Sequence, residues 1–346
     1  PHAAAQAARS ALRRISPISS AVLARGMSWP MSGYITSREP GTAFAVAIPP
    51  LGFTSGSTRP CTTSVGAVTR ASCAVRSVLA MMAAVCRAVP SGRKLRSTWF
   101  RRQLELGVIP DGTELAPRNP GVDAWDDLPE NQQRLAARLQ EAFAAFLDHT
   151  DDQIGRFVDG LRRLGRLDNT ILVVLADNGA SQEGGPFGVM HEMKFFNGIL
   201  ETPDEAVARI DDIGGPHSHT NYPWGWAQCG NVPFKWYKQN THEGGVHVPM
   251  IVHWPHRVEA VGLRHQFTYV ADIAPTIYEL VGVEPPDVYR GVEQLPVTGH
   301  SFASALTDPD ASATNTLQYF EMAGSRALVA GEWKAVCRHR PGADYD

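Results

Sequence analysis

The chain has 346 residues, of which 43% are hydrophobic and 19% are charged, and its formal net charge is −3. This is the composition of an ordinary soluble globular protein, with ample length for a buried core. No run of about 18 uninterrupted apolar residues occurs, so we expect no membrane-spanning segment.

Charge divides the chain into two unequal parts. Residues 1–102 contain thirteen Arg, one Lys and one acid, Glu39, whereas residues 103–346 hold 18 bases and 34 acids. Residues 1–92 are rich in Ala, Arg, Ser, Pro and Gly and show no sustained period of 3.6 or 2. They are compatible with an organellar presequence, a basic disordered arm or a coding region read out of frame, and we favour the last. We therefore expect this segment to be disordered or not native. Because it lacks Lys clusters and interleaved aromatics, we expect no nucleic-acid partner.

Regular patterns begin at Leu95. Apolar residues recur at helical spacing from Leu128 to Gly165, which predicts a long helix that packs its apolar stripe on a sheet. The following apolar run, Ile171–Ala176, predicts a buried strand that ends at Asp177 and Asn178. In open α/β sheets, ligands bind at this edge of the strands.

Asp177 and Asn178 offer the oxygen ligands that hard divalent cations prefer, although Asp-Asn-Gly is also a common turn. Two ligands make an incomplete site, because Ca²⁺ takes about 6–8 oxygens. Residues 179–230 then form a long loop-rich segment that contains Tyr-Pro-Trp-Gly-Trp at 222–226. Placed after the ligand strand, this loop is expected to wall a pocket that suits an apolar or aromatic substrate.

A second polar element lies some sixty residues after the first. Lys238 and His242 stand beside Glu243 and two glycines, which let the backbone pass close to a ligand, and a strand-like segment follows at 248–255. A lysine aimed into a pocket with a divalent cation can hold an anion and stabilise charge in a transition state. A solvated lysine is the alternative.

The remaining patterns divide the chain into domains. Asp272-Ile-Ala-Pro-Thr-Ile predicts a helix start, and residues 317–321, 326–329 and 331–336 predict a strand and a hairpin. We expect an α/β domain over residues 93–310 and a small β subdomain over 311–346. The five cysteines (Cys61, Cys73, Cys86, Cys229 and Cys337) are odd in number and scattered, which favours a reduced, cytoplasmic chain.

From Leu95 to Val336 the chain resembles a sulfatase of the alkaline-phosphatase superfamily, specifically a bacterial arylsulfatase-like protein. The resemblance is carried in order by residues 100–110, 168–170, 176–179, 192–198, 238–245, 251–255, 272–276, 319–321 and 333–336. It implies a three-layer α/β fold that lacks its N-terminal strands, with a small C-terminal antiparallel subdomain. The implied activity is sulfuric ester hydrolysis of a small-molecule sulfate ester, and the oligomeric state is left open.

The resemblance also implies roles for individual residues. Asp177 and Asn178 correspond to ligands of a Ca²⁺ or Mg²⁺ ion, and Lys238 corresponds to a lysine that contacts the sulfate. His2, in Pro-His-Ala-Ala-Ala-Gln-Ala, is similar to the family's histidine segment and would be a general acid or sulfate contact.

Two features of the family pattern are absent from this chain. No strand ends in two adjacent aspartates, and no cysteine lies in the Cys-x-Pro-Ser-Arg motif whose cysteine becomes the formylglycine nucleophile. We therefore expect a truncated or frame-disrupted sulfatase that is inactive as this chain. The alternatives are a phosphate or phosphonate monoester hydrolase of the same superfamily and a non-catalytic remnant that binds an anion.

Overall fold

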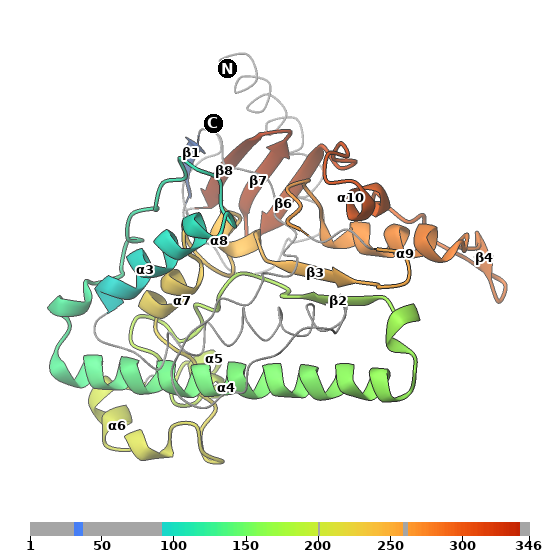
Figure 1. The fold of residues 1–346 in the computed structure, drawn as a ribbon. Coiled ribbons are helices and arrows are strands. Elements are labelled where there is room, and N and C mark those ends of the chain that lie inside the picture. The colour runs from blue at the N-terminus through green and yellow to red at the C-terminus, as the bar shows by residue number, and fades with distance from the viewer. Residues whose placement is uncertain (1–30, 37–91, 200, 259–261, 340–346) are drawn as a thin grey trace.

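A computed structural model describes residues 31–36, 92–199, 201–258 and 262–339 (Figure 1). The helices are α3 (Gly92–Glu105), α4 (Glu130–Arg163), α5 (Glu192–Phe196), α6 (Pro203–Val207), α7 (Trp224–Gly230), α8 (Glu243–Val246), α9 (Ile273–Val281) and α10 (Ala303–Thr307). The strands are β1 (Met31–Thr36), β2 (Leu172–Leu175), β3 (Met250–His253), β4 (Val288–Tyr289), β5 (Val292–Glu293), β6 (Leu317–Met322), β7 (Ser325–Ala330) and β8 (Trp333–His339). Within the described part, no helix is both long and apolar enough to cross a membrane.

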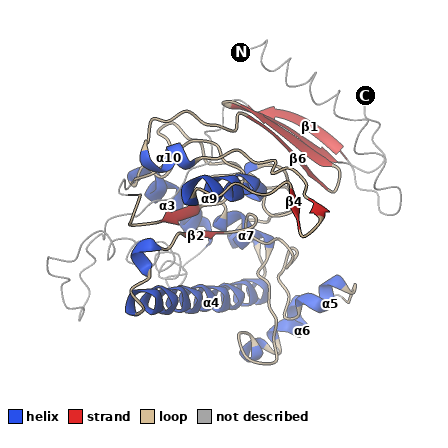
Figure 2. Cartoon of the chain, turned by 90° about the vertical axis from the view of Figure 1, so that its right-hand side faces the viewer, coloured by secondary structure: helices blue, strands red, loops and turns tan. Residues whose placement is uncertain are grey.

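The strands β2 and β3 form a layer between helices. They pair antiparallel, with Leu172 opposite His253 and Leu175 opposite Met250. In both views α4 lies on one side of this pair and α9 on the other (Figures 1 and 2). The expected mixture of helices and sheets is therefore confirmed. The sheet between α4 and α9 has two described strands, β2 and β3. The run at 171–176 is only partly buried, because Leu175 is 40% exposed.

The long helix is present, but its apolar stripe is not uniformly buried. Leu135 and Leu139 of its first half pack into the main core against Met190, Tyr222 and Trp226, which belong to the long loop and to α7. The expectation that the whole stripe packs on a sheet is wrong. Further along the stripe some large apolar side chains are exposed, with exposed fractions of 64% for Phe146, 61% for Phe157 and 74% for Leu164, which follows the end of α4.

The helix α9 covers the other face of the strand pair. Ile273 and Leu280 of α9 pack with Val173 of β2 and Met250 of β3 in a second, smaller core. The side chain of Asp272, at the start of α9, accepts hydrogen bonds from the backbone N–H groups of Tyr269 at 2.7 Å and of His300 at 2.8 Å. This buried carboxylate thereby fixes the predicted helix start to a distant loop.

The C-terminal strands form an antiparallel sheet, as the sequence predicts. Its order is β1-β8-β7-β6, and β7 and β8 are joined by a tight hairpin in which Ala330 lies opposite Trp333. The edge strand β1 comes from the basic segment 1–92 and pairs antiparallel with β8. Residues 1–30, including His2, and residues 37–91 lie outside the described residues.

Candidate functional site

The turn that follows β2 carries the two predicted cation ligands. Asp177 is exposed, and Asn178 is partly buried. The side-chain N–H of Asn178 donates to the carbonyl of Gly179 at 2.9 Å, which leaves its side-chain oxygen available to accept. A carboxylate and an amide oxygen thus lie next to each other at the end of a strand.

Gly179 brings this turn against the second polar element. Its N–H donates to the carbonyl of Gly245 at 3.0 Å, so the two segments are joined through their backbones. A Cβ atom on Gly179 would lie 1.7 Å from the carbonyl oxygen of Gly244. Only a residue without a side chain fits here, which explains why glycine follows the two predicted ligands.

Lys238 lies beside the same turn. Its backbone N–H donates to the carbonyl of Ala180 at 3.1 Å. Asn231 binds both segments, because its side-chain oxygen accepts from the N–H of Ala180 at 2.9 Å while its side-chain N–H donates to the carbonyl of Gly244 at 2.7 Å. The residues at 177–180 and 238–245, some sixty positions apart in sequence, are therefore held side by side.

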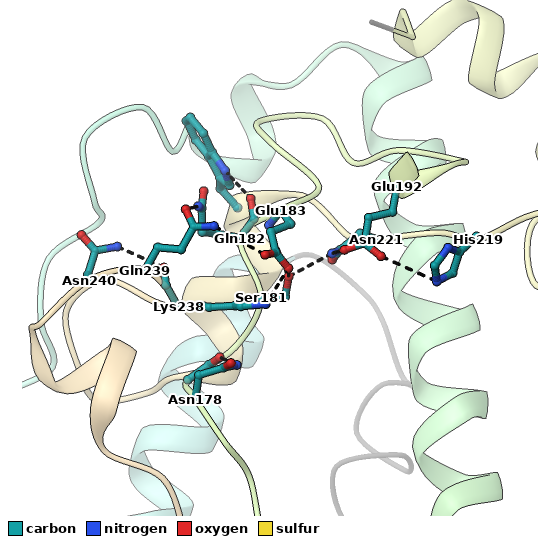
Figure 3. A network of polar contacts seen from close by, with 12 residues as sticks. Asn178, Ser181, Gln182, Glu183, Glu192, His219, Asn221, Lys238, Gln239 and Asn240 are labelled. Carbon is teal, nitrogen blue, oxygen red and sulfur yellow. Dashed lines mark hydrogen bonds and ion pairs between the residues drawn. The ribbon is translucent and has the colours of Figure 1, made fainter. Parts of the chain in front are cut away.

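The amine of Lys238 is paired, not simply solvated. Its Nζ atom lies 2.9 Å from Oε2 of Glu183, and the hydroxyl of Ser181 donates to the same oxygen at 2.9 Å (Figure 3). The side chain of Gln239 donates to the other carboxylate oxygen at 3.4 Å. Glu183 is buried, so in this arrangement the charge of Lys238 is neutralised by a carboxylate with little access to water.

The polar network continues away from Lys238 (Figure 3). The side-chain N–H of Asn221 donates to the hydroxyl of Ser181 at 2.9 Å and approaches Glu192 at 3.5 Å. Glu192 in turn lies 3.6 Å from Nε2 of His219. The loop at 179–230 therefore supplies polar groups to the site as well as core residues.

A buried cluster of charged side chains surrounds Glu243, next to the glycines that contact the turn at 177–180. Oε1 of Glu243 pairs with Nζ of Lys334 from β8, and Oε2 lies 2.7 Å from Nδ1 of His247. Burial alone would raise the pKa of Glu243, but the charges and hydrogen bonds of Lys334 and His247 lower it to about 2. Because Glu243 precedes Gly244, this cluster connects the C-terminal sheet to the backbone that contacts Gly179.

His242 is an uncharged neighbour of this cluster. Burial lowers its pKa to about 3, and the positive charges of Lys334, Lys235 and Arg338 act in the same direction. Its Nδ1 atom is buried and has no hydrogen-bond partner. At neutral pH this side chain therefore contributes no positive charge to the site.

The expected cation site is only partly assembled by described residues. In the described part of the chain, no group of three or more His, Cys, Asp or Glu side chains is gathered to hold a metal ion. The oxygens of Asp177 and Asn178 have the right chemistry for a hard cation but supply two of the roughly six to eight ligands that Ca²⁺ takes. Among the cysteines, Cys229 and Cys337 are described and form no disulfide, and neither lies in the nucleophile motif.

Three residues that organise the site could not be identified as site residues from the sequence. Glu183, Asn231 and Lys334 act through contacts with residues 55, 13 and 91 positions away in the chain. Only Glu183 had a local signal, since it lies just after the Asp-Asn-Gly turn and before a pair of glycines.

Known sulfatases resemble this chain in sequence. The sequence model of the sulfatase family matches residues 112–283. An uncharacterised sulfatase of Schizosaccharomyces pombe is 30% identical over 249 residues, covering 70% of this chain and 43% of the relative. An arylsulfatase of Klebsiella aerogenes is 28% identical over 200 residues, covering 58% of this chain and 41% of the relative.

A phosphonate monoester hydrolase from Silicibacter pomeroyi is a structural neighbour with 18% identity and a TM-score of 0.34, covering 64% of this chain and 38% of that one. The chain spans less than half the length of these relatives. Together, the matched segment and the two sulfatase relatives show that residues 112–283 belong to the sulfatase family.

Proposed function

We propose that this chain contributes part of the active site of a sulfuric ester hydrolase of the arylsulfatase type. The observation that carries the proposal is the backbone contact between the turn at 177–180 and the segment at 238–245. That contact supports the proposal because it joins the turn that carries Asp177 and Asn178 to the segment that carries Lys238. The substrate class is a small-molecule sulfate ester.

Each residue has a distinct role in this proposal. The oxygens of Asp177 and Asn178 would hold a Ca²⁺ or Mg²⁺ ion together with further ligands. Such a cation would supply positive charge to the sulfate ester. Lys238 binds a sulfate oxygen and stabilises the charge that gathers there during hydrolysis. His2 remains a further candidate for a general acid or sulfate contact.

Glu183 determines how readily the amine of Lys238 can bind an anion. An amine that already pairs with a buried carboxylate at 2.9 Å must give up or share that contact to bind an anion. We therefore expect the pair to weaken sulfate binding by the chain alone. A bound cation would offset the negative charge of Glu183 in the assembled site.

No cysteine of this chain matches the nucleophile motif, so we expect no turnover of 4-nitrophenyl sulfate by the chain alone. Release of nitrophenol above background that is abolished by Asp177→Ala would refute this expectation. We also expect the chain to reside in the cytoplasm, because its cysteines are odd in number and scattered.

Binding experiments test the site without requiring turnover. Calorimetric titration with Ca²⁺ and then with inorganic sulfate should show cation binding that is lost in Asp177→Ala. The matched control is Asp168→Ala, an exposed aspartate in the turn before β2. Lys238→Met should keep cation binding and weaken sulfate binding, whereas Glu183→Gln should strengthen sulfate binding.

Two outcomes would contradict the proposal. Equal cation binding by Asp177→Ala and Asp168→Ala would show that this turn does not hold the cation. Unchanged sulfate binding in Lys238→Met would remove the lysine from the anion site. A strong preference for phosphate over sulfate would instead favour a phosphate or phosphonate ester hydrolase.

A further inference from the structure

A cavity lies outside the candidate site. Its volume is about 330 Å³, within the range of small-molecule sites. It is formed by α3, the loop at 118–125, the start of α4, the loop at 186–187 and α7. The described residues that line it do not include Asp177, Asn178 or Lys238. We call it the tryptophan cavity, after Trp125, Trp224 and Trp226 in its walls.

The tryptophans present apolar ring surface to this cavity. The indole N–H of Trp226 donates to the carbonyl of Ala136 at 2.9 Å, and that of Trp224 donates to the carbonyl of Gln182 at 2.8 Å. The ring centroids of Trp125 and Trp226 are 5.5 Å apart and tilted by 56°. Because two of the polar N–H groups are already bonded to the backbone, these walls favour a flat apolar ligand.

Positive charge lines the same cavity. Arg96 extends from α3, and its Nη2 atom donates to the carbonyl of Ala116, while its Nε atom is buried without a hydrogen-bond partner. Burial lowers the pKa of Arg96, an effect that Cys229 opposes and the charge of Arg118 reinforces. The charge of the exposed Arg118 therefore acts on the half-buried guanidinium of Arg96.

The balance of charge in the lining selects the sign of a ligand. Arg96 and Arg118 contribute two positive charges, and Asp123 contributes one negative charge. An anionic group near the two guanidinium groups would pair with their positive charges and reduce the repulsion between them. A cationic ligand would instead be repelled by the two arginines.

We propose that the tryptophan cavity binds a planar aromatic molecule that carries one anionic group. The aromatic part lies against the indole rings, and the anion pairs with Arg96 and Arg118. This proposal does not rest on the hydrolase activity, because it uses none of the residues assigned to the sulfate site.

The test is calorimetric titration of the chain with 2-naphthalenesulfonate. Trp125→Ala and Arg118→Met should each weaken binding by about tenfold, the effect of losing one wall or one charged contact. Trp333→Ala in β8 and Arg101→Met in α3 are matched controls outside the cavity and should bind as the parent chain does. The uncharged 2-naphthol should bind about tenfold more weakly than the sulfonate.

Three results would overturn the proposal. They are absence of binding at millimolar ligand, equal binding of 2-naphthol and 2-naphthalenesulfonate, and loss of affinity in the controls equal to that in the cavity variants. Arg118 is exposed, so Arg118→Met is expected to fold and tests the charge even where Trp125→Ala does not fold.

Discussion

Replacing Lys334 by methionine should destabilise the chain strongly, because Glu243 would remain buried without its main partner. Glu243 is 9% exposed and Lys334 is 5% exposed. Holding the pKa of Glu243 at about 2, below its usual 4.5, stabilises the folded chain by about 3 kcal/mol at neutral pH. Removing one partner of such a pair typically costs about 3–5 kcal/mol. We therefore expect Lys334→Met to lower the free energy of unfolding by about 3 kcal/mol or more.

The pH dependence provides an independent readout of the same contact. A carboxylate with a lowered pKa in the folded state stabilises the fold above pH 4.5, and this stabilisation is lost as the pH falls from 4.5 toward 2. Lys334→Met should remove most of this acid-dependent loss. Urea unfolding followed by tryptophan fluorescence, at neutral pH and through this window, measures both quantities.

Two further variants isolate the buried charge. Lys334→Met combined with Glu243→Gln should be more stable than Lys334→Met alone, because no unpaired charge is left in the interior. Lys194→Met removes a lysine that pairs with Glu201 at 2.8 Å but is 41% exposed, so it should cost less than about 1 kcal/mol. If Lys334→Met unfolds like the parent chain at every pH in the window, the reasoning about this cluster is wrong.

Three other substitutions test the packing around the site. Gly179→Ala should cost several kcal/mol, roughly 3 or more, because its Cβ would meet the carbonyl of Gly244 at 1.7 Å. Its control, Gly160→Ala in the last turn of α4, has room for a Cβ and should instead raise the melting temperature. Asp272→Ala should lower the free energy of unfolding by about 2–4 kcal/mol, because the buried N–H groups of Tyr269 and His300 lose their acceptor; a cost below about 1 kcal/mol in urea titrations would contradict this. His242→Phe should be neutral or stabilising at pH 7, and it should remove a loss of stability as the pH falls from 6.5 toward 3, since the unfolded histidine binds a proton in that range and the folded one does not. An unchanged pH profile of unfolding in His242→Phe would show that another group causes the loss.

The sequence by itself determined the local elements and the family. Helical spacing predicted α4 within a few residues, and the start of α9 and the three C-terminal strands were predicted correctly. These features depend on neighbours in the chain, where periodicity and turn residues act directly. The Asp-Asn-Gly turn and the Lys238 segment were also readable, because their residue types stand out from an apolar surrounding.

Tertiary structure decided what those residues touch. Periodicity marks an apolar stripe but not its partner, so it could not show that Leu139 is buried while Phe157 is exposed. Likewise, no local pattern indicates that Lys238 pairs with Glu183, or that a lysine in β8 neutralises Glu243, 91 residues before it. The backbone contact between Gly179 and Gly245 joins two segments that are far apart in sequence. The ionisation and availability of each candidate group therefore follow from burial and pairing, which are properties of the folded chain.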